Sequence, residues 1–462
     1  MVFSSNFFIF AFLPLFLLLL FLTPARYRNT TILIASLIFY AAGSGQLVTI
    51  LLFSIIINHF LGIQLSRYSN KALLSCGIIL NLAILGYFKY AGFFWQEFSA
   101  AITRLGLSTE NSSLDIVLPI GISFFTFQAI SYLIDNYNGT IRPAKSLTSF
   151  GMYLANFPQL IAGPIVRYSD IQDSIEKRPI TVDLLTAGIY RFSIGLGKKI
   201  LIADSMGSLA DQIFSLPQSE LTSSLAWLGI IAYTLQIYFD FSGYSDMAIG
   251  LGKMMGFNFP ENFNQPYRSK SITEFWRRWH MTLSNWFRDY LYIPLGGNRN
   301  GRYRTYFNLF AVFFFCGLWH GAAYTFIVWG LFHGLLLTLE RLFLNKWNLK
   351  PSGFLGQVYA LLFVMVGWVF FRSDSMTQSL SYLEAMFGLG QGANEFFSIQ
   401  YYLTNDKLLT LILAVVIAVA PFERISSAKT NNPKIYFALV VLALVTIELA
   451  GNVFNPFIYF RF

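Results

Sequence analysis

The sequence predicts an all-α polytopic membrane protein, and its composition gives three reasons for that fold class. Hydrophobic residues make up 55% of the 462 residues and charged residues only 12%, whereas soluble domains carry about 25% charged residues. The mean hydropathy is +0.55. Apolar stretches long enough to cross roughly 30 Å of hydrocarbon recur along nearly the whole chain. Because lipid offers no hydrogen bonds to the backbone, such spans must be helices.

The first apolar stretch, FFIFAFLPLFLLLLFLT at residues 7–23, has no basic segment before it and no small-residue cleavage site after it. We therefore interpret it as a retained span rather than a signal peptide. Residues 31–42 and 46–64 fit two short helices or one bent pair around Gly43 and Gly45. Further spans are predicted at 72–95, 117–134, 223–239, 306–322, 324–344, 354–371, 407–422 and 435–453.

Two segments depart from the pattern of a simple span. Residues 150–167, FGMYLANFPQLIAGPIVR, are broken by prolines and glycines, so this backbone is expected to be buried in protein or to line a wet cavity as a re-entrant or broken helix. Residues 181–203 carry Arg191, Lys198 and Lys199 and are expected to lie partly in the membrane interface. With no internal repeat or linker, residues 1–462 are predicted to form one domain of about eleven spanning helices.

The net charge of +9 is better explained by membrane topology than by nucleic-acid binding, because Lys and Arg in short loops mark the cytoplasmic side. The basic pairs Arg26/Arg28, Arg67/Lys71 and Arg142/Lys145 then face the cytoplasm, and the N-terminus lies outside. The two cysteines, Cys76 and Cys316, lie in apolar runs and suggest neither a disulfide framework nor a metal site.

The stretch EFWRRWHMTLSNWFRDYLYIPLGGNR at 274–299 is the most unusual in this apolar chain. A long cytoplasmic loop that sets topology explains its arginines, and so does a basic amphipathic segment on anionic headgroups. Its interleaved rings favour a wall or docking surface instead. These aromatic residues are Trp276, Trp279, Trp286, Tyr290 and Tyr292.

The chain has four histidines: His59, His280, His320 and His333. An ionisable side chain inside a span is costly and points to function by default. His320, in CGLWHGAAYTF between Gly317 and Gly321, lies in a run without charged residues, where it would stay neutral and suit a general base. A packing histidine in a small-residue helix seam is the alternative. His59 and His333 are weaker candidates.

Asp240 and Asp246, in YFDFSGYSDMAIG, are expected in a Gly/Ser-interrupted turn, where a structural role is favoured over cation binding. The sequence has no GxSxG, Walker or HExxH motif.

Five segments resemble the membrane-bound O-acyltransferases, and within them the bacterial branch that acetylates polysaccharides. Two of these segments are especially specific: FWRRWHMTLSNWFRDYLYIPLGGNR at 275–299 and GLWHGAAYTFIVWGLFHG at 317–334. The other three are YFDFSGYSDMAIGLGKMMGF at 238–257, FPQLIAGPIVR at 157–167 and LGYFKYAGFF at 85–94.

The resemblance implies a helical ring around a central tunnel, with the LWHG histidine, His320, essential and the WRRWH histidine, His280, facing the same tunnel. The donor, acetyl-CoA or another acyl thioester with or without a carrier protein, would dock from the cytoplasm, and no cofactor or metal is implied. The expected donor-binding or tunnel-lining residues are Trp276, Arg277, Trp279, Arg288 and Trp319.

The function implied is passage of an acetyl group across the bacterial inner membrane for O-acetylation of an exported, alginate-like polysaccharide. A periplasmic partner of the SGNH-hydrolase type would finish the reaction, since the chain shows no large extramembrane domain. Two alternatives stay open: D-alanyl transfer to teichoic acid, and a transporter or flippase without acyl chemistry. The segments LGGNRNGRYRTY at 295–306 and NPFIYFRF at 455–462 favour the polysaccharide acetylases over the D-alanyl transferases.

Overall fold

The computed structural model describes residues 2–106, 114, 116–344, 352–390, 392, 398–420 and 432–451. Over these residues every element is helical and none is a strand, which confirms the all-α prediction. NPFIYFRF at 455–462 lies outside the described residues. The chain forms two compact units, Met1–Ile189 with Ala248–Pro260 and Tyr190–Met247 with Glu261–Phe462. The single-domain organisation stays a prediction.

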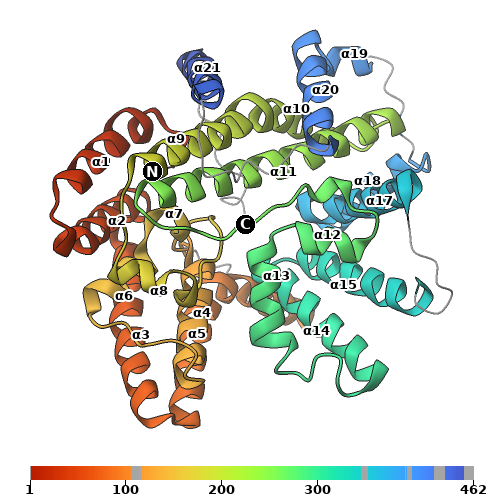
Figure 1. Cartoon of the computed structure of the whole chain (residues 1–462). Helices are drawn as coiled ribbons and strands as arrows, with labels where there is room; N and C mark the ends of the chain where they lie inside the picture. Colours follow the sequence, from red (N-terminus) through yellow and green to blue (C-terminus); the bar gives the residue numbers. More distant parts are fainter. Residues whose placement is uncertain are drawn as a thin grey trace. The chain divides into compact units, whose positions relative to one another are not determined.

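The first unit is mostly the red to yellow part of Figure 1. The pattern around Gly43 and Gly45 resolves into two helices, because Gly45 takes a left-handed φ of 56° that ends the first one. The helical segments of this unit are η1 (Phe8–Phe12), α1 (Leu13–Leu22), η2 (Ala25–Tyr27), α2 (Arg28–Ser44), η3 (Gly45–Leu47), α3 (Val48–Tyr68), α4 (Lys71–Arg104), α5 (Ile122–Tyr137), α6 (Leu147–Ala155), α7 (Phe157–Leu160), α8 (Tyr168–Glu176) and the first half of α9 (Val182–Gly197).

Polar side chains join the helices of the first unit where lipid offers no partner. Asn58 on α3 and Asn81 on α4 are buried and exchange two amide hydrogen bonds, of 3.1 and 2.7 Å. One turn further along α3, Gly62 lets the ring of Tyr132 on α5 approach. Close backbone approach at small residues and interhelical hydrogen bonds are how helices associate in membranes.

The segment 150–167 is broken, as predicted. Helix α6 stops at Ala155, α7 runs for a single turn, and the chain from Ile161 to Val166 is buried without being helical. Two side chains of the segment bond to its own carbonyl groups: Gln159 Nε2 donates to the carbonyl of Tyr153 at 2.6 Å, and the Tyr153 hydroxyl donates to the carbonyl of Val166 at 3.2 Å. Irregular backbone is therefore tolerated here because protein surrounds it.

The second unit contains the predicted chemistry-bearing stretches. A helix lies at each predicted span of this unit, but the helices Gly301–His320 and Asn405–Val419, at the predicted spans 306–322 and 407–422, are not among those long and apolar enough to cross a membrane. Helix α11 continues into the first unit beyond Met247. Besides the end of α9, its elements are η4 (Lys198–Ala203), α10 (Asp204–Phe214), α11 (Ser223–Met254), η5 (Pro266–Arg268), α12 (Ile272–Arg278), α13 (Met281–Phe287), η6 (Arg288–Tyr292), α14 (Gly301–His320), α15 (Tyr324–Leu339), η7 (Glu340–Leu344), α17 (Gly353–Arg372), α18 (Met376–Met386), α19 (Ile399–Tyr402), α20 (Asn405–Val419) and α21 (Asn432–Gly451).

Six helical stretches among the described residues are long and apolar enough to cross a membrane: Ala25–Tyr68, Lys71–Arg104, Ser223–Met254, Tyr324–Phe343, Gly353–Arg372 and Pro433–Gly451. Phe8–Leu22, the expected first span, is a shorter apolar helix. A polytopic helical membrane fold follows from these spans, while the total of about eleven stays a prediction.

Helices α14 and α15 pack backbone against backbone, side by side in Figure 1. A Cβ on Gly317 would lie 2.3 Å from the carbonyl oxygen of Phe326, and one on Gly330 would lie 2.2 Å from that of Phe313. Real side chains cannot occupy those positions, so glycine is required at both. The contact holds the end of α14 that carries His320.

We expect Gly330→Ala to destabilise the protein by about 1–3 kcal/mol, because the added methyl must push α14 away. Gly86→Ala on α4 is the matched control, since nothing lies within 4 Å of its Cβ position, and it should be neutral or slightly stabilising. Thermal unfolding of the detergent-solubilised protein measures both. Equal melting temperatures for the two variants would contradict this account of the helix contact.

Candidate active site

Three of the four histidines lie in the second unit and are buried: His280, His320 and His333. His59 lies in the first unit on α3, where its ring stacks on Phe150 with ring centres 5.8 Å apart. The structure therefore separates His59 from the other three by unit, and the site is built from the second unit alone.

Helix α12 is anchored at its N-terminus by two side chains. The Ser271 hydroxyl accepts from the backbone N–H of Glu274 at 3.0 Å, as an N-cap does. The carboxylate of Glu340, from the turn after α15, accepts from the backbone N–H groups of Ile272 and Thr273 at 2.6 and 2.9 Å. A carboxylate at a helix N-terminus is favoured by the helix dipole. The helix that leads into WRRWH is therefore fixed against α15.

His280 lies at the interruption between helices α12 and α13. Its φ is 41°, a left-handed conformation that non-glycine residues rarely adopt, and only surrounding structure can maintain it. That structure is the loop at Asn262–Asn264: the Met281 N–H donates to the carbonyl of Asn262, and the Asn264 N–H donates to that of Arg278, both at 2.9 Å.

The side chain of Asn262 fixes the protonation pattern of His280. The backbone N–H of Thr282 can only donate, and it donates to one amide atom of Asn262 at 3.3 Å, which identifies that atom as the oxygen; the amide nitrogen donates to the Ser245 hydroxyl at 3.1 Å. That oxygen lies 3.0 Å from Nδ1 of His280 and accepts from the Thr282 hydroxyl at 2.9 Å. Nδ1 must therefore carry the proton, and Nε2 is left with a lone pair. Among the described residues Nε2 has no hydrogen-bond partner.

The ring of His280 is uncharged. It lies outside the six candidate spans, yet burial lowers its pKa from 6.5 to about 3, because a charged imidazolium would lose its hydration. Its neighbours are aromatic: Phe241 at 4.7 Å and Trp319 at 6.1 Å between ring centres. At neutral pH His280 thus presents a neutral acceptor nitrogen in a dry setting.

His320 is the last residue of α14 and lies among aromatic rings. Its ring meets those of Trp319, Trp329 and Phe371 edge to face, with centres 4.9, 5.0 and 5.1 Å apart. Gly321 follows in an extended conformation, and the Phe326 ring occupies the space where its Cβ would be. The end of α14 thus places His320 in a cage of aromatic rings.

One aromatic cluster connects the three buried histidines. Trp319 contacts both His280 and His320, and Trp329 contacts both His320 and His333. His333 accepts a hydrogen bond at Nδ1 from Trp276 Nε1 at 3.3 Å. His280 and His320 therefore share Trp319 as a neighbour, while the tunnel that the resemblance implied stays a prediction. His333 is like His280 in that its Nδ1 has a partner and its Nε2 has none among the described residues.

The other predicted lining residues divide into two groups. Trp276, Trp279 and Trp319 are buried within this cluster, whereas Arg277 and Arg288 are exposed. The Arg288 guanidinium is bound to the neighbouring Asp289 carboxylate, at 2.6 and 3.0 Å. Within 274–299 the rings of Trp276 and Trp279 therefore pack inward, whereas Arg277 and Arg288 are exposed and Tyr290 and Tyr292 are half-buried.

The acidic residues of α11 correct one expectation. Asp240 and Asp246 do not lie in a turn, because α11 is a continuous helix from Ser223 to Met254. Asp246 pairs with Arg191 at 2.6 Å and Lys198 at 2.7 Å, and Asp240 lies 3.1 Å from Lys199. The place of 181–203 partly in the membrane interface stays a prediction.

These ion pairs confirm the favoured structural role of the two aspartates. Arg191 and Lys199 are buried, and a buried charge needs a partner to offset its lost hydration. Gly195 and Gly243 allow the close approach: a Cβ on Gly195 would lie 2.5 Å from the carbonyl oxygen of Gly243. No group of three or more metal-ligating side chains is found in the part of the chain that the structure describes.

Comparison with known proteins identifies the family of this chain. The sequence profile of the MBOAT, membrane-bound O-acyltransferase family matches residues 142–382, just over half of the chain. The chain belongs to this family. It is an O-acyltransferase embedded in a membrane, which argues against a transporter without acyl chemistry.

Three curated relatives show how far the likeness extends. The chain is 43% identical to a probable alginate O-acetylase, AlgI, of Azotobacter vinelandii, over 100% of both chains. It is 37% identical to a peptidoglycan O-acetyltransferase of Helicobacter pylori, over 84% of this chain and 80% of that one. A teichoic acid D-alanyltransferase of Bacillus subtilis is 33% identical over 50% of this chain and 60% of its own length.

Sequence reasoning missed Asn262 and the pairing of the α11 aspartates. Asn262 lies in a loop, NFNQPY, whose composition suggests only a turn. Its role depends on the loop running beside residues 278–282, and no periodicity records that proximity. For the aspartates, the sequence contains the basic residues Arg191, Lys198 and Lys199, but it does not show which face of the helix they occupy.

The role of Asn262 can be tested with Asn262→Asp, which keeps the acceptor oxygen and adds a negative charge. A carboxylate beside Nδ1 favours the imidazolium and raises the pKa of His280. If transfer needs neutral His280, the acidic limb of the pH–rate profile should move to higher pH, measured on purified protein in nanodiscs. Thr282→Val is the control, since it removes only a hydroxyl from the same oxygen. A profile for Asn262→Asp that coincides with wild type would rule this positioning role out.

Proposed function

We propose that this enzyme passes an acetyl group from a cytoplasmic thioester donor across the bacterial inner membrane for O-acetylation of an exported, alginate-like polysaccharide. The observation that carries the proposal is the placement of His280 and His320 against the same ring, Trp319, in a buried cluster. The likeness to a probable alginate O-acetylase over the full length of both chains supports the choice of acceptor class.

In the proposed reaction His320 acts as general base. It removes the proton of the attacking hydroxyl while the hydroxyl oxygen bonds to the thioester carbonyl carbon. The carbon–sulfur bond then breaks, and the thiolate of the donor leaves and takes up a proton. General base catalysis of this kind contributes roughly 10²–10⁴-fold. An apolar cage suits the role, because a neutral imidazole accepts a proton and a charged one does not.

The tautomer of His280 limits which hydrogen-bonding role this side chain can have in the reaction. With the proton on Nδ1, Nε2 offers a lone pair, so in this state it accepts hydrogen bonds and donates none to a carbonyl oxygen. We assign His280 to orienting an N–H or O–H group of a substrate. The oxyanion needs a donor, and Trp329 Nε1, which contributes to the cage around His320, has no acceptor among the described residues.

The donor side is proposed to be cytoplasmic. Acetyl-CoA or an acyl carrier protein is the donor in this scheme, and both are anionic, which suits the exposed Arg277 and Arg288. The acetyl group would continue to a periplasmic SGNH-type partner that completes glycan acetylation. This partner and the donor rest on the family resemblance.

A second acceptor, peptidoglycan, is favoured by one observation, the 37% identity to a peptidoglycan O-acetyltransferase over most of both chains. Transfer of D-alanine to teichoic acid is less well supported, because that likeness covers only half of this chain. Mass spectrometry of cell-surface glycans from cells with and without the enzyme separates the three acceptors directly.

We expect His320→Asn to fold and to lose roughly 10²-fold or more of transfer, because an amide cannot accept the hydroxyl proton. Exchange of one polar side chain for another in a lipid-embedded bundle should cost about a kcal/mol. His59→Asn, in the other unit, should keep most activity. The measurement is acetyl transfer by monodisperse protein in nanodiscs, with glycan acetate measured in complemented cells. A well-folded His320→Asn that transfers at the wild-type rate would make His280 the leading base.

We expect Arg277→Ala to raise the donor concentration needed for half-maximal transfer several-fold, because an exposed guanidinium attracts an anionic donor. Its folding should be unaffected, since the side chain is exposed. Trp279→Ala is unsuitable for this test, because Trp279 is 4% exposed and packs on Trp368 at 5.0 Å. Arg104→Ala, an exposed arginine of the first unit, is the control. An unchanged donor dependence at low salt would show that Arg277 does not face the donor.

A further inference from the structure

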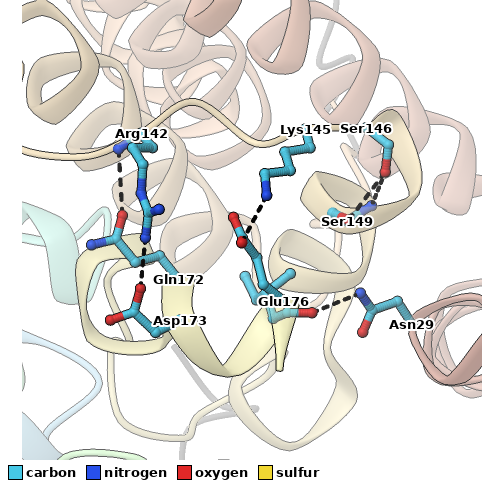
Figure 2. A network of polar contacts seen from close by, with 9 residues as sticks. Asn29, Arg142, Lys145, Ser146, Ser149, Gln172, Asp173 and Glu176 are labelled. Atoms are coloured by element: carbon cyan, nitrogen blue, oxygen red, sulfur yellow. Dashed lines mark hydrogen bonds and ion pairs between the residues drawn. The ribbon is translucent and has the colours of Figure 1, made fainter. Parts of the chain in front are cut away.

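A basic pocket in the first unit has no part in the proposed chemistry. It has a volume of about 400 Å³ and two walls: the chain from Ala25 to Asn29, where η2 leads into α2, and Ile175–Pro179, where α8 ends. Asn29 ties the walls together by donating to the carbonyl of Ile175 at 3.0 Å (Figure 2). All of these residues belong to one unit, so the pocket is a feature of that unit alone.

The pocket has an excess of positive charge. Its lining includes Arg26, Arg28, Lys177 and Arg178 and a single acidic residue, Glu176. The Glu176 carboxylate is already bound to Lys145 at 2.7 Å, as Figure 2 shows. None of the four cations forms an ion pair with a carboxylate in the part of the chain that the structure describes.

Two guanidinium nitrogens in this pocket's lining are buried and unused. Arg28 Nε and Arg178 Nη2 have no hydrogen-bond partner among the described residues. A buried donor without an acceptor costs free energy, and two such donors on neighbouring cations are unusual unless an anion completes them. Two effects lower the pKa of Arg178 to about 10: burial of its guanidinium, and then the positive charge of the nearby Arg28.

The rest of the Arg178 side chain is held rigidly. Its Nε donates to the carbonyl of Met255 at 3.0 Å, Nη1 donates to Asn29 Oδ1 at 2.7 Å, and the guanidinium lies 4.5 Å over the ring of Phe257. The Arg178 side chain is thus already fixed and would lose little freedom on binding an anion. Preorganised planar guanidinium groups suit phosphate oxygens in particular.

The position of the pocket along the chain indicates where such a phosphate would come from. Ala25 begins a candidate span, Ala25–Tyr68, and directly follows the apolar helix Phe8–Leu22. The pocket is therefore at the level where an apolar helix meets water, which is the level of lipid headgroups. Leu22 and Tyr27, on either side of Ala25, are 73% and 54% exposed and would contact acyl chains.

We propose that this pocket binds a phosphate group, with Arg28 and Arg178 as its donors, and that the phosphate belongs to the headgroup of an anionic phospholipid. A soluble phosphate compound, such as a nucleotide-bearing acyl thioester, presents the same chemistry and is the alternative source. The site is separate from the histidine cluster, which lies in the other unit, and it does not depend on the proposed acyl transfer.

The test uses the full-length protein in zwitterionic detergent and counts bound molecules by native mass spectrometry as phosphatidylglycerol, phosphatidylcholine, inorganic phosphate or acetyl-CoA is added. Arg28→Gln is the main variant, because it removes the unpaired Nε of Arg28 and leaves the hydrogen bonds of Arg178 in place. Arg142→Gln is the matched control: it is a neighbouring exposed arginine paired with Asp173 at 2.8 Å (Figure 2) and does not line the pocket.

We expect wild type and Arg142→Gln to retain one phosphatidylglycerol, and Arg28→Gln to bind it about tenfold or more weakly, with partial recovery in Arg28→Lys. Binding of inorganic phosphate or acetyl-CoA with the same Arg28 dependence, without selective lipid binding, would support the phosphate site and identify a soluble source. If folded Arg28→Gln binds all four probes as wild type does, the proposal is overturned. A melting temperature near that of wild type establishes that the variant is folded.

Discussion

The carboxamide of Asn262 is the contact on which the rest of the site depends. It is fully buried, and its oxygen lies within hydrogen-bonding distance of His280 and Thr282 while its nitrogen reaches Ser245 on α11. In a helical bundle without water, every polar group must find its partner inside the protein. Here the Asn262 side chain alone supplies hydrogen-bond partners to Ser245, His280 and Thr282. It also determines which nitrogen of His280 carries the proton.

The same constraint explains the two ways in which the protein treats buried cations. Arg191 and Lys199 lie against acidic residues of α11 and η4–α10, with Asp204 2.6 Å from Lys199. Their charges are offset, and they hold helices together. Arg28 and Arg178 lack such partners, although each has a buried nitrogen. Because uncompensated buried charge is expensive, we interpret the first pair as structural and the second pair as the proposed anion-binding site.

Glycines and tryptophans complete the support for the histidines. Gly317 and Gly330 bring α14 and α15 into backbone contact, which places the end of α14, and hence His320, beside Trp329 on α15. Trp319 then bridges His320 to His280. Large rings fill the space between close helices without adding charge, and such a setting favours the neutral form of an imidazole, which is the form that acts as a general base.

The sequence by itself determined the fold class, the positions of most helices and the two histidines of interest. Hydrophobic length and composition report these features directly, because the cost of exposing polar backbone to lipid acts on each segment separately. The break at 150–167 was predictable for the same reason. Only the tertiary structure decided the partner of each polar group: Asn262 with His280, Asp246 with Arg191, and the pairing of distant basic segments into one pocket. Those choices depend on which faces of different helices meet, and contacts between residues 18 to 149 positions apart leave no local pattern in the sequence.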